Sequence, residues 1–298
     1  MPRTFPPDVL VLDSDSLLHA RLSRGQKGLR VVQSRKYALA AETFTPSVVT
    51  PEFADGAALT EALRRLRLDS GKWDKASLLL PDSWFRINII ELPSLPTRPD
   101  EAAQIVRWAL KRTLPISPDL LRISYEPVSR NGHGVKVIAV SAVDAALSAL
   151  EESLRRAGIE VVLIEPVGLN IWNAIAVREN DPGAMQLFIY ARATEFTTAV
   201  FRGGQPLFIR SRNLSGARSI HQEIRLSANY LRELLETDAI ASCYIAGDMA
   251  DDDLQATLAA EFKTQVRPVV LRDFVEEVPM GSSGHDAELT ACTGVFTG

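Results

Sequence analysis

The fold is decided by the stretch DVLVLDSDSLLHARL, residues 8–22. Residues 8–12 are almost entirely apolar, which is typical of a buried strand. The polar run at 13–16 interrupts this pattern and predicts a tight turn. Residues 18–22 then alternate between apolar and polar side chains, as a half-buried strand does. The stretch therefore predicts a β-hairpin whose tip carries two aspartates, Asp13 and Asp15.

The order of elements that begins with this hairpin occurs twice in the chain. In the first half the pattern predicts a third strand at 29–33, a helix at 57–66 and a strand at 76–80. In the second half it predicts strands at 186–190, 197–201 and 206–211, a helix at 217–235 and a strand at 241–246. The halves share little residue identity. The repeated order nevertheless predicts two related α/β subdomains that face each other.

A module of different character lies between the halves. Thr97 and Asp100 resemble a capping box before a helix that continues to Leu110, and Ser141 with Asp144 resembles a second one. The pattern predicts strands at 121–125, 135–140 and 159–164 around these helices. The resulting α-β-β-α-β order predicts a small split-sheet module inserted into the larger fold.

Composition and charge exclude several classes of function. The 298 residues carry 33 Lys and Arg against 37 Asp and Glu, a net charge of 33 − 37 = −4, so no basic field favours nucleic acid. Cys243 and Cys292 are too far apart for a CxxC site and suit a reducing compartment. The most apolar stretch, 161–177, contains Glu165 and is too short to span a bilayer. We therefore expect a protein of a reducing compartment, with any membrane role exerted through a partner or through surface attachment.

Common catalytic and metal-binding motifs are absent from the sequence. It contains no P-loop, no nucleophile elbow and no HExxH metal motif. The four histidines, at positions 19, 133, 221 and 285, lie far apart, so we expect no metal site. The acidic run at 251–253 stands where a helix is predicted to begin, and helix capping explains it better than a bound cation.

A series of short motifs resembles the PilM family of type IV pilus proteins, to which the cytoplasmic part of the type II secretion protein GspL is related. The motifs are Leu-Pro-Asp-Ser at 80–83, Glu-Leu-Pro at 91–93, Val-Arg-Trp at 106–108, Leu-Pro-Ile at 114–116 and Ser-Tyr-Glu at 124–126. Residues 161–174 and 223–230 continue the series. Each motif is moderately specific, and their order covers most of the chain.

The resemblance implies an actin-like ATPase fold of the ribonuclease H-like class, with a small α/β module inserted into the first subdomain. On this basis we expect the first subdomain at 1–95 plus 163–183, the module at 96–162 and the second subdomain at 184–298. In the family a fourth subdomain lies between the last hairpin and the long helix. Here the chain passes from 209–211 almost directly into that helix, so this subdomain is expected to be missing.

The nucleotide-binding turns of the family are degraded in this sequence. The first turn, Asp-Ile-Gly-Ser followed by Lys in the family, is matched here by residues 13–16, which have Asp15 in place of Gly and no Lys after them. The second, Asp-Ile-Gly-Ala, is matched by residues 190–193 and has lost both Asp and Gly. We expect a degenerate cleft, no catalytic residue and no cofactor. Its residues would be Asp13, Asp15, Ser16, Tyr190, Arg192, Gly247 and Asp248.

The function that the resemblance implies is that of a scaffold. Such a protein holds the N-terminal cytoplasmic tail of a PilN-like bitopic inner-membrane protein and links the membrane platform to a motor ATPase. By resemblance the tail would lie between the first subdomain and the inserted module. We expect Trp84, Arg86, Arg107 and Trp108 to border this groove, with core packing as the competing explanation.

Two alternatives to a scaffold without ATPase activity stay open at this stage. One is a divergent ATP-binding protein, in which Asp13, Asp15 and Arg192 rebuild a site for ATP and magnesium. The other is a sugar or acetate kinase of the same fold superfamily. The kinase is disfavoured because no further catalytic carboxylate accompanies an intact phosphate turn.

Overall fold

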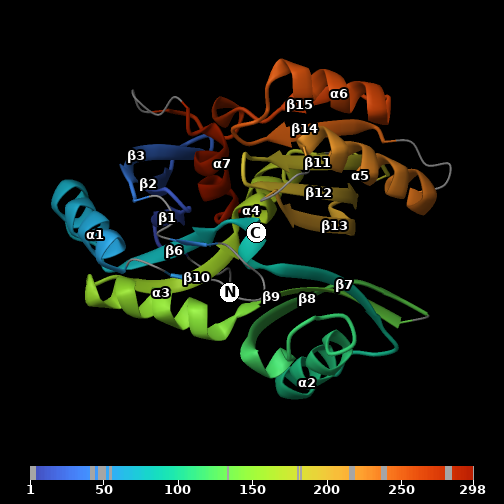
Figure 1. The fold of residues 1–298 in the computed structure, drawn as a ribbon, viewed down its shortest axis with the longest axis horizontal. Helices are drawn as coiled ribbons and strands as arrows, with labels where there is room; N and C mark the ends of the chain where they lie inside the picture. Colours follow the sequence, from blue (N-terminus) through green and yellow to red (C-terminus); the bar gives the residue numbers. More distant parts are fainter. Residues whose placement is uncertain are drawn as a thin grey trace.

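The computed structural model describes residues 5–40, 44–45, 52–53, 56–132, 134–179, 181, 183–214, 219–235, 240–278 and 284–297. Its elements form two five-stranded sheets, a smaller three-stranded sheet and helices packed on their faces (Figure 1). A short two-stranded ribbon, β4 (Phe44–Thr45) with β5 (Glu52–Phe53), lies outside these sheets.

The first large sheet has the strand order β10-β6-β1-β2-β3. Its strands are β1 (Asp8–Leu12), β2 (Ser16–Arg24), β3 (Leu29–Ala38), β6 (Lys75–Leu80) and β10 (Glu160–Pro166). The predicted hairpin is confirmed, since β1 pairs antiparallel with β2 up to Leu12 opposite Leu17. Helices α1 (Gly56–Ser70) and α3 (Asp144–Arg156) pack on one face of this sheet.

The second large sheet repeats this arrangement with the order β13-β12-β11-β14-β15. Its strands are β11 (Met185–Ala191), β12 (Glu195–Arg202), β13 (Gln205–Asn213), β14 (Ser242–Ala246) and β15 (Val266–Pro268). Helices α5 (Ile220–Leu235) and α6 (Asp252–Phe262) cover its outer face. The helix predicted at 217–235 is seen from Ile220, and its first two residues lie outside the described residues. The predicted duplication is therefore present in the fold.

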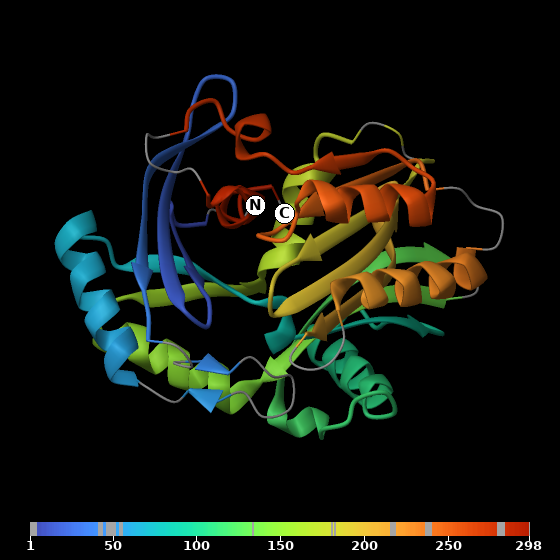
Figure 2. The ribbon, with the colours of Figure 1, turned by 45° about the horizontal axis from the view of Figure 1, so that its top comes forward.

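Two helices, α4 (Val167–Ala176) and α7 (Asp286–Gly294), lie between the two large sheets (Figure 2). One continuous core joins both sheets to them. The first sheet contributes Val9 and Val11, whereas their neighbours Leu10 and Leu12 face α1 and α3. This alternation is why both strand faces of the segment 8–12 are apolar. The contact with the second large sheet includes Trp172 of α4, which stacks on Phe201 of β12 with ring centroids 3.8 Å apart.

The crossing of α4 and α7 depends on a glycine. A Cβ on Gly294 would lie 2.6 Å from the carbonyl carbon of Asn170, inside any permitted contact. Only a residue without a side chain lets the backbones of the two helices approach this closely. The short 3₁₀ segment η3 (Leu271–Asp273) precedes α7 and adds Leu271 to the same core.

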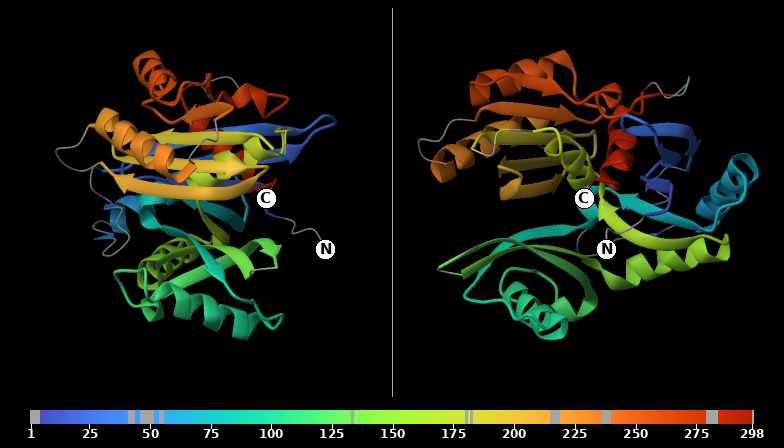
Figure 3. Two further views of the ribbon diagram at one scale, coloured as in Figure 1. Left: turned by 90° about the vertical axis from the view of Figure 1, so that its right-hand side faces the viewer. Right: turned by 180° about the vertical axis from the view of Figure 1, so that it is seen from behind.

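The inserted module is a three-stranded sheet of order β7-β9-β8, packed on one helix. Its strands are β7 (Arg86–Leu92), β8 (Leu121–Asn131) and β9 (Gly134–Val143), and its helix is α2 (Pro99–Leu110). The 3₁₀ turns η1 (Asp82–Trp84) and η2 (Pro118–Leu120) precede β7 and β8. The helix α2 covers the face turned away from the second large sheet, and the other face lies toward β13 (Figure 3).

The sheet pairings correct the predicted module. The strand predicted at 159–164 does not close it, because β10 pairs in parallel with β6 in the first large sheet. The helix α3 also belongs to the first subdomain, where its apolar side chains pack against α1. The third strand of the module is instead β7, which begins at Arg86 and thus before the predicted boundary at 96.

Both predicted capping boxes are also wrong. The helix α2 follows Arg98 with Pro99 in its first turn, and α3 follows Val143, and neither N-cap side chain bonds to the helix. A proline in the first turn loses no intrahelical hydrogen bond, which explains why α2 begins there. The capping predicted for the acidic run is confirmed, since Asp251 accepts a hydrogen bond of 2.8 Å from the Leu254 amide. Within the described residues, no helix is long and apolar enough to cross a membrane.

The helix crossing gives a first testable prediction. We expect Gly294→Ala to lower the free energy of unfolding by about 1–3 kcal/mol, because the new methyl group must push α7 away from Asn170. The measurement is urea denaturation followed by circular dichroism. The control is Gly132→Ala, since an added Cβ at Gly132 meets no atom within 4 Å. Equal midpoints for the two variants would contradict the role of Gly294.

Candidate functional site

The tips of the two duplicated hairpins meet between the large sheets. Arg192, at the β11–β12 turn, forms an ion pair through Nη1 with Oδ2 of Asp13, at the β1–β2 turn. Its Nε lies 3.6 Å from Oδ2 of Asp248. The side chains of Arg192 and Asp13 are only 14% and 9% exposed. The structure thus brings together three of the residues that the sequence assigned to the degenerate cleft.

Burial alone would lower the pKa of Arg192, because it disfavours the charged guanidinium. Tyr190, once ionised, and the neighbouring carboxylates of Asp13, Glu288 and Asp248 outweigh burial, so the pKa of Arg192 is raised above its ordinary value. Arg192 therefore stays positively charged and holds the two turns together.

Backbone donors at both turns are bonded to carboxylates of the protein itself. The amide of Ser14 donates to Asp13 Oδ1 at 2.6 Å, and the amide of Ala193 donates to Asp248 Oδ1 at 3.2 Å. In addition, the Ser16 hydroxyl donates to Asp15 Oδ1 at 2.9 Å. A phosphate at these turns would have to displace carboxylates from its donors and would be repelled by them.

A cavity of 610 Å³ lies beside the two turns. Its charged lining side chains are Asp15, Asp248, Asp286, Glu288, Lys36 and Arg192. Lys36 lies 3.4 Å from Glu288, so both cations of the cavity already face carboxylates. This cavity is where the sequence expected the degenerate cleft, and its charge suits a polyphosphate poorly.

The remaining cleft residues have structural explanations. Tyr190 is buried on β11, and burial raises its pKa well above the ordinary value. Gly247 has a φ of +109°, and a Cβ there would lie 2.8 Å from the carbonyl carbon of Ala191. This glycine is required for the approach of two backbones, a role that is independent of any nucleotide.

The structure adds a buried carboxyl pair that the sequence analysis missed. Asp82 accepts hydrogen bonds of 2.7 Å from the Gly168 amide and the Thr197 hydroxyl, and Glu195 accepts one of 3.0 Å from the Ser83 amide. These bonds join the end of the first subdomain's β6 to α4 and to β12 of the second subdomain. The only sequence signal was Asp82 within the Leu-Pro-Asp-Ser motif.

Both carboxyl groups have raised pKa values. Burial is the main cause for each, and in Glu195 the nearby charge of Asp82 adds to it. Hydrogen bonds from Gly168 and Thr197 partly offset the effect of burial on Asp82. The pair therefore prefers to hold at least one proton when the two subdomains are in contact.

The four residues predicted to border one groove do not share one. Trp84 is 2% exposed and packs in the core of the first subdomain, whereas Trp108 is 67% exposed on α2. The Arg107 guanidinium donates to the Pro118 carbonyl and so ties α2 to η2. Arg86 lies in a separate cleft against β13. The prediction of a common groove is therefore wrong, because it rested on closeness in sequence.

A groove of 540 Å³ does lie between the first subdomain and the module. The strands β8 and β9 form one wall, β10 and α4 form another, and the β12–β13 hairpin closes one side. Its apolar lining includes Ile138, Val140, Leu169, Trp172, Phe201 and Pro206. Glu126 and Glu165 line the groove as well, and its lining residues include no Lys or Arg. The groove is thus mainly apolar with a negative charge.

The protein is similar to known proteins in its structure and not in its sequence. No family model matches the sequence, and no curated protein matches it significantly. Among solved structures, the PilM-PilN type IV pilus biogenesis complex contains a chain with a TM-score of 0.80 and 19% identity, over 99% of this chain and 98% of that one.

Two further structures are similar at lower scores. The cytoplasmic domain of EpsL, an inner-membrane component of the type II secretion system of Vibrio cholerae, has a TM-score of 0.56 and 12% identity over 98% of this chain and 94% of that one. A Bacteroides thetaiotaomicron protein of unknown function with an actin-like ATPase fold has a TM-score of 0.54 and 11% identity, over 90% of this chain and 91% of that one.

The carboxyl pair gives a second prediction. The folded protein binds a proton that the unfolded chain releases in the ordinary carboxyl range, so stability should fall as pH rises from about 5 to about 9. The glutamine of Glu195→Gln stays neutral at every pH. The free energy of unfolding of this variant should therefore fall by about 2–4 kcal/mol less than that of the wild type across this range. Denaturation at each pH measures it, with the exposed Glu233→Gln as control. Parallel curves for wild type and Glu195→Gln would contradict the assignment.

The chain has the actin-like fold that the family resemblance implied. Its structural resemblance to PilM and to the cytoplasmic domain of EpsL is confirmed.

Proposed function

We propose that this protein is a scaffold of the inner-membrane assembly platform of a type IV pilus or type II secretion-like machine. In this role it lies in the cytoplasm and reaches the inner membrane through the N-terminal cytoplasmic tail of a PilN-like bitopic protein. A contact with the motor ATPase would complete the link. The similarity to a chain of the PilM-PilN complex supports the assignment, and the groove between β8 and β10 is the observation that carries it.

The groove suits an extended peptide because two sheet edges border it. β8 is an outer strand of the module sheet, and β10 is an outer strand of the first large sheet. The groove is lined by the consecutive residues 124–128 of β8 and 163–166 of β10. An added peptide strand would pair its backbone with one of these edges and place alternate side chains in the apolar lining.

The charge of the groove suits the same partner. Cytoplasmic segments next to a membrane span are enriched in Lys and Arg. Glu126 and Glu165 line the groove, whose lining residues include no Lys or Arg, and Glu165 accepts a 2.9 Å hydrogen bond from Asn170. A tail with apolar anchors and at least one basic residue matches both the shape and the charge.

We further propose that the protein does not hydrolyse ATP. Arg192 takes the position between the two turns where a phosphate and its metal would lie, and Asp13 is its partner. Amides at both turns are occupied by carboxylates. The alternative, a divergent ATP-binding protein, is favoured by the size of the 610 Å³ cavity alone. Its acidic lining argues against that alternative.

A tail-binding experiment tests the scaffold proposal. Labelled synthetic N-terminal tails of bitopic proteins encoded beside this gene are titrated with the full chain, and anisotropy is recorded. We expect one tail to bind, and Ile138→Glu to weaken it at least about tenfold. Ile138 lies on the groove face of β9, because its neighbours Val137 and Ala139 face α2.

The matched control is Trp108→Ala, which removes an exposed aromatic side chain from α2, the helix that packs on the face of the module sheet opposite the groove. It should bind the tail like the wild type. Circular dichroism melting verifies that both variants are folded. Binding that survives Ile138→Glu and is lost in Trp108→Ala would place the partner elsewhere, and failure of every tail would overturn the scaffold proposal.

A nucleotide titration tests the second part. We expect no turnover of ATP with Mg²⁺, and no Mg²⁺-dependent ATP binding that Asp13→Ala removes. The reason is that Arg192 already pairs with Asp13, and Asp248 already accepts the hydrogen bond of the Ala193 amide. Calorimetry up to millimolar ATP and a phosphate-release assay provide the two measurements. Turnover that Asp13→Ala abolishes would establish the ATP-binding alternative instead.

A further inference from the structure

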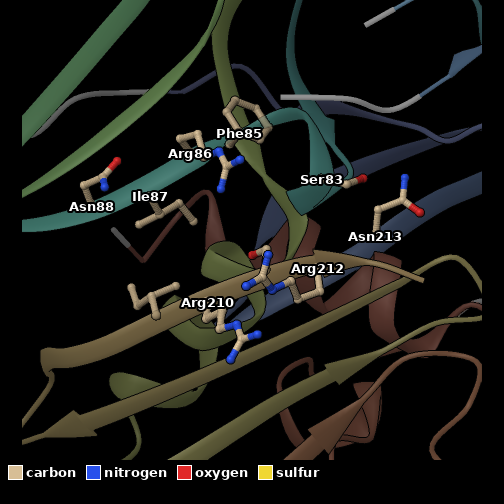
Figure 4. Close-up of a pocket in the computed structure, with 10 residues that line it drawn as sticks. Ser83, Phe85, Arg86, Ile87, Asn88, Arg210, Arg212 and Asn213 are labelled. Atoms are coloured by element: carbon tan, nitrogen blue, oxygen red, sulfur yellow. The ribbon is translucent and has the colours of Figure 1, made fainter. Parts of the chain in front are cut away.

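A second cleft, of 390 Å³, separates the module from the second large sheet. One wall is the start of β7 with the turn before it, and the other is the end of β13 (Figure 4). Its lining residues are Ser83, Phe85, Arg86, Ile87, Asn88, Ile209, Arg210, Ser211, Arg212 and Asn213. We call this space the arginine cleft. Its volume falls in the range of roughly 300–1,000 Å³ that is usual for small-molecule sites.

The arginine cleft concentrates positive charge. The side chain of Arg86 extends from β7 toward Arg212 and Arg210, which come from β13 (Figure 4). The lining residues include no Asp or Glu. Arg210 has Glu223 at 3.9 Å behind it, whereas Arg86 and Arg212 form no ion pair within the described part of the chain. Burial, with the facing charge of Arg212, lowers the pKa of Arg86.

Arg86 also keeps a hydrogen-bond donor unused. Its Nε is buried and has no partner among the described residues, and the same is true of Asn88 Oδ1. A buried donor or acceptor without a partner costs about 1–3 kcal/mol. Two facing guanidinium groups, one with an unpaired Nε, are a costly arrangement for a purely structural role. They are what an anion would satisfy on entering the cleft.

We propose that the arginine cleft binds a soluble phosphorylated small molecule. A guanidinium group can donate two hydrogen bonds to one phosphate, and Arg86 and Arg212 together offer two positive charges to a phosphorylated ligand. A hydroxyl of the ligand would donate to Asn88 Oδ1, and Phe85, Ile87 and Ile209 offer an apolar wall.

The arginine cleft is distinct from the cavity at the two hairpin turns, since the two share no lining residue. It adjoins the buried carboxyl pair instead. Ser83, whose amide bonds Glu195, lines the cleft, and so does Ser211, whose hydroxyl lies 2.9 Å from that of Thr197. The proposal is independent of tail binding, because β7 and β13 form this site whether or not the other groove is occupied.

Calorimetric titration of the full chain with pyrophosphate, without Mg²⁺ and at low ionic strength, tests the proposal. We expect saturable binding that Arg86→Gln and Arg212→Gln each weaken at least about tenfold, and that Arg86→Lys partly retains. The exposed Arg225→Gln is the control and should leave the affinity unchanged. Arg192→Gln, at the hairpin turns, distinguishes binding in the cavity beside those turns from binding in the arginine cleft. Sulfate should bind much more weakly than pyrophosphate.

Melting temperatures give a second readout. Without ligand, Arg212→Gln should melt at or above the wild-type temperature, because it relieves the repulsion on Arg86. Pyrophosphate should raise the melting temperature of the wild type and not that of this variant. No binding at millimolar pyrophosphate, equal binding of sulfate, or binding lost in Arg192→Gln and kept in Arg86→Gln would each overturn the proposal.

Discussion

The crossing of α4 and α7 is the constraint on which the rest of this structure depends. Gly294 lies against the backbone of Asn170, and no larger residue fits there. Because the two helices touch, one apolar core continues from the first large sheet through both helices into the second. The duplicated hairpins make a further contact between the halves, where Asp13 pairs with Arg192. The helix crossing and this ion pair join the duplicated halves.

The contacts between the two halves hold them together directly. Arg192 and the buried Asp82 and Glu195 make the connection between the halves. Side chains that bond each other across a cleft need no ligand to close it. The charge that remains in the cavity is acidic, which deepens the contrast with a phosphate site.

Local patterns predicted the elements well and their partners less well. The hairpin at 8–22 was predictable because its alternation and its turn are neighbours in sequence. The assignment of β10 to the wrong sheet followed from the lack of any local signal for a pairing with β6, a strand far away in the chain. Trp84 and Trp108 look alike in sequence, yet one is buried and the other exposed. The groove and the arginine cleft escaped prediction because each is built from strands that only the fold brings together.

Strand β13 borders both the groove and the arginine cleft, so the electrostatic potential changes sign along it. Its first residues, Gln205 and Pro206, border the acidic groove, and its last ones carry Arg210 and Arg212. A basic chain laid along this strand is attracted at one end and repelled at the other. The charge gradient along β13 therefore favours one orientation of a bound charged segment, independently of specific side-chain contacts.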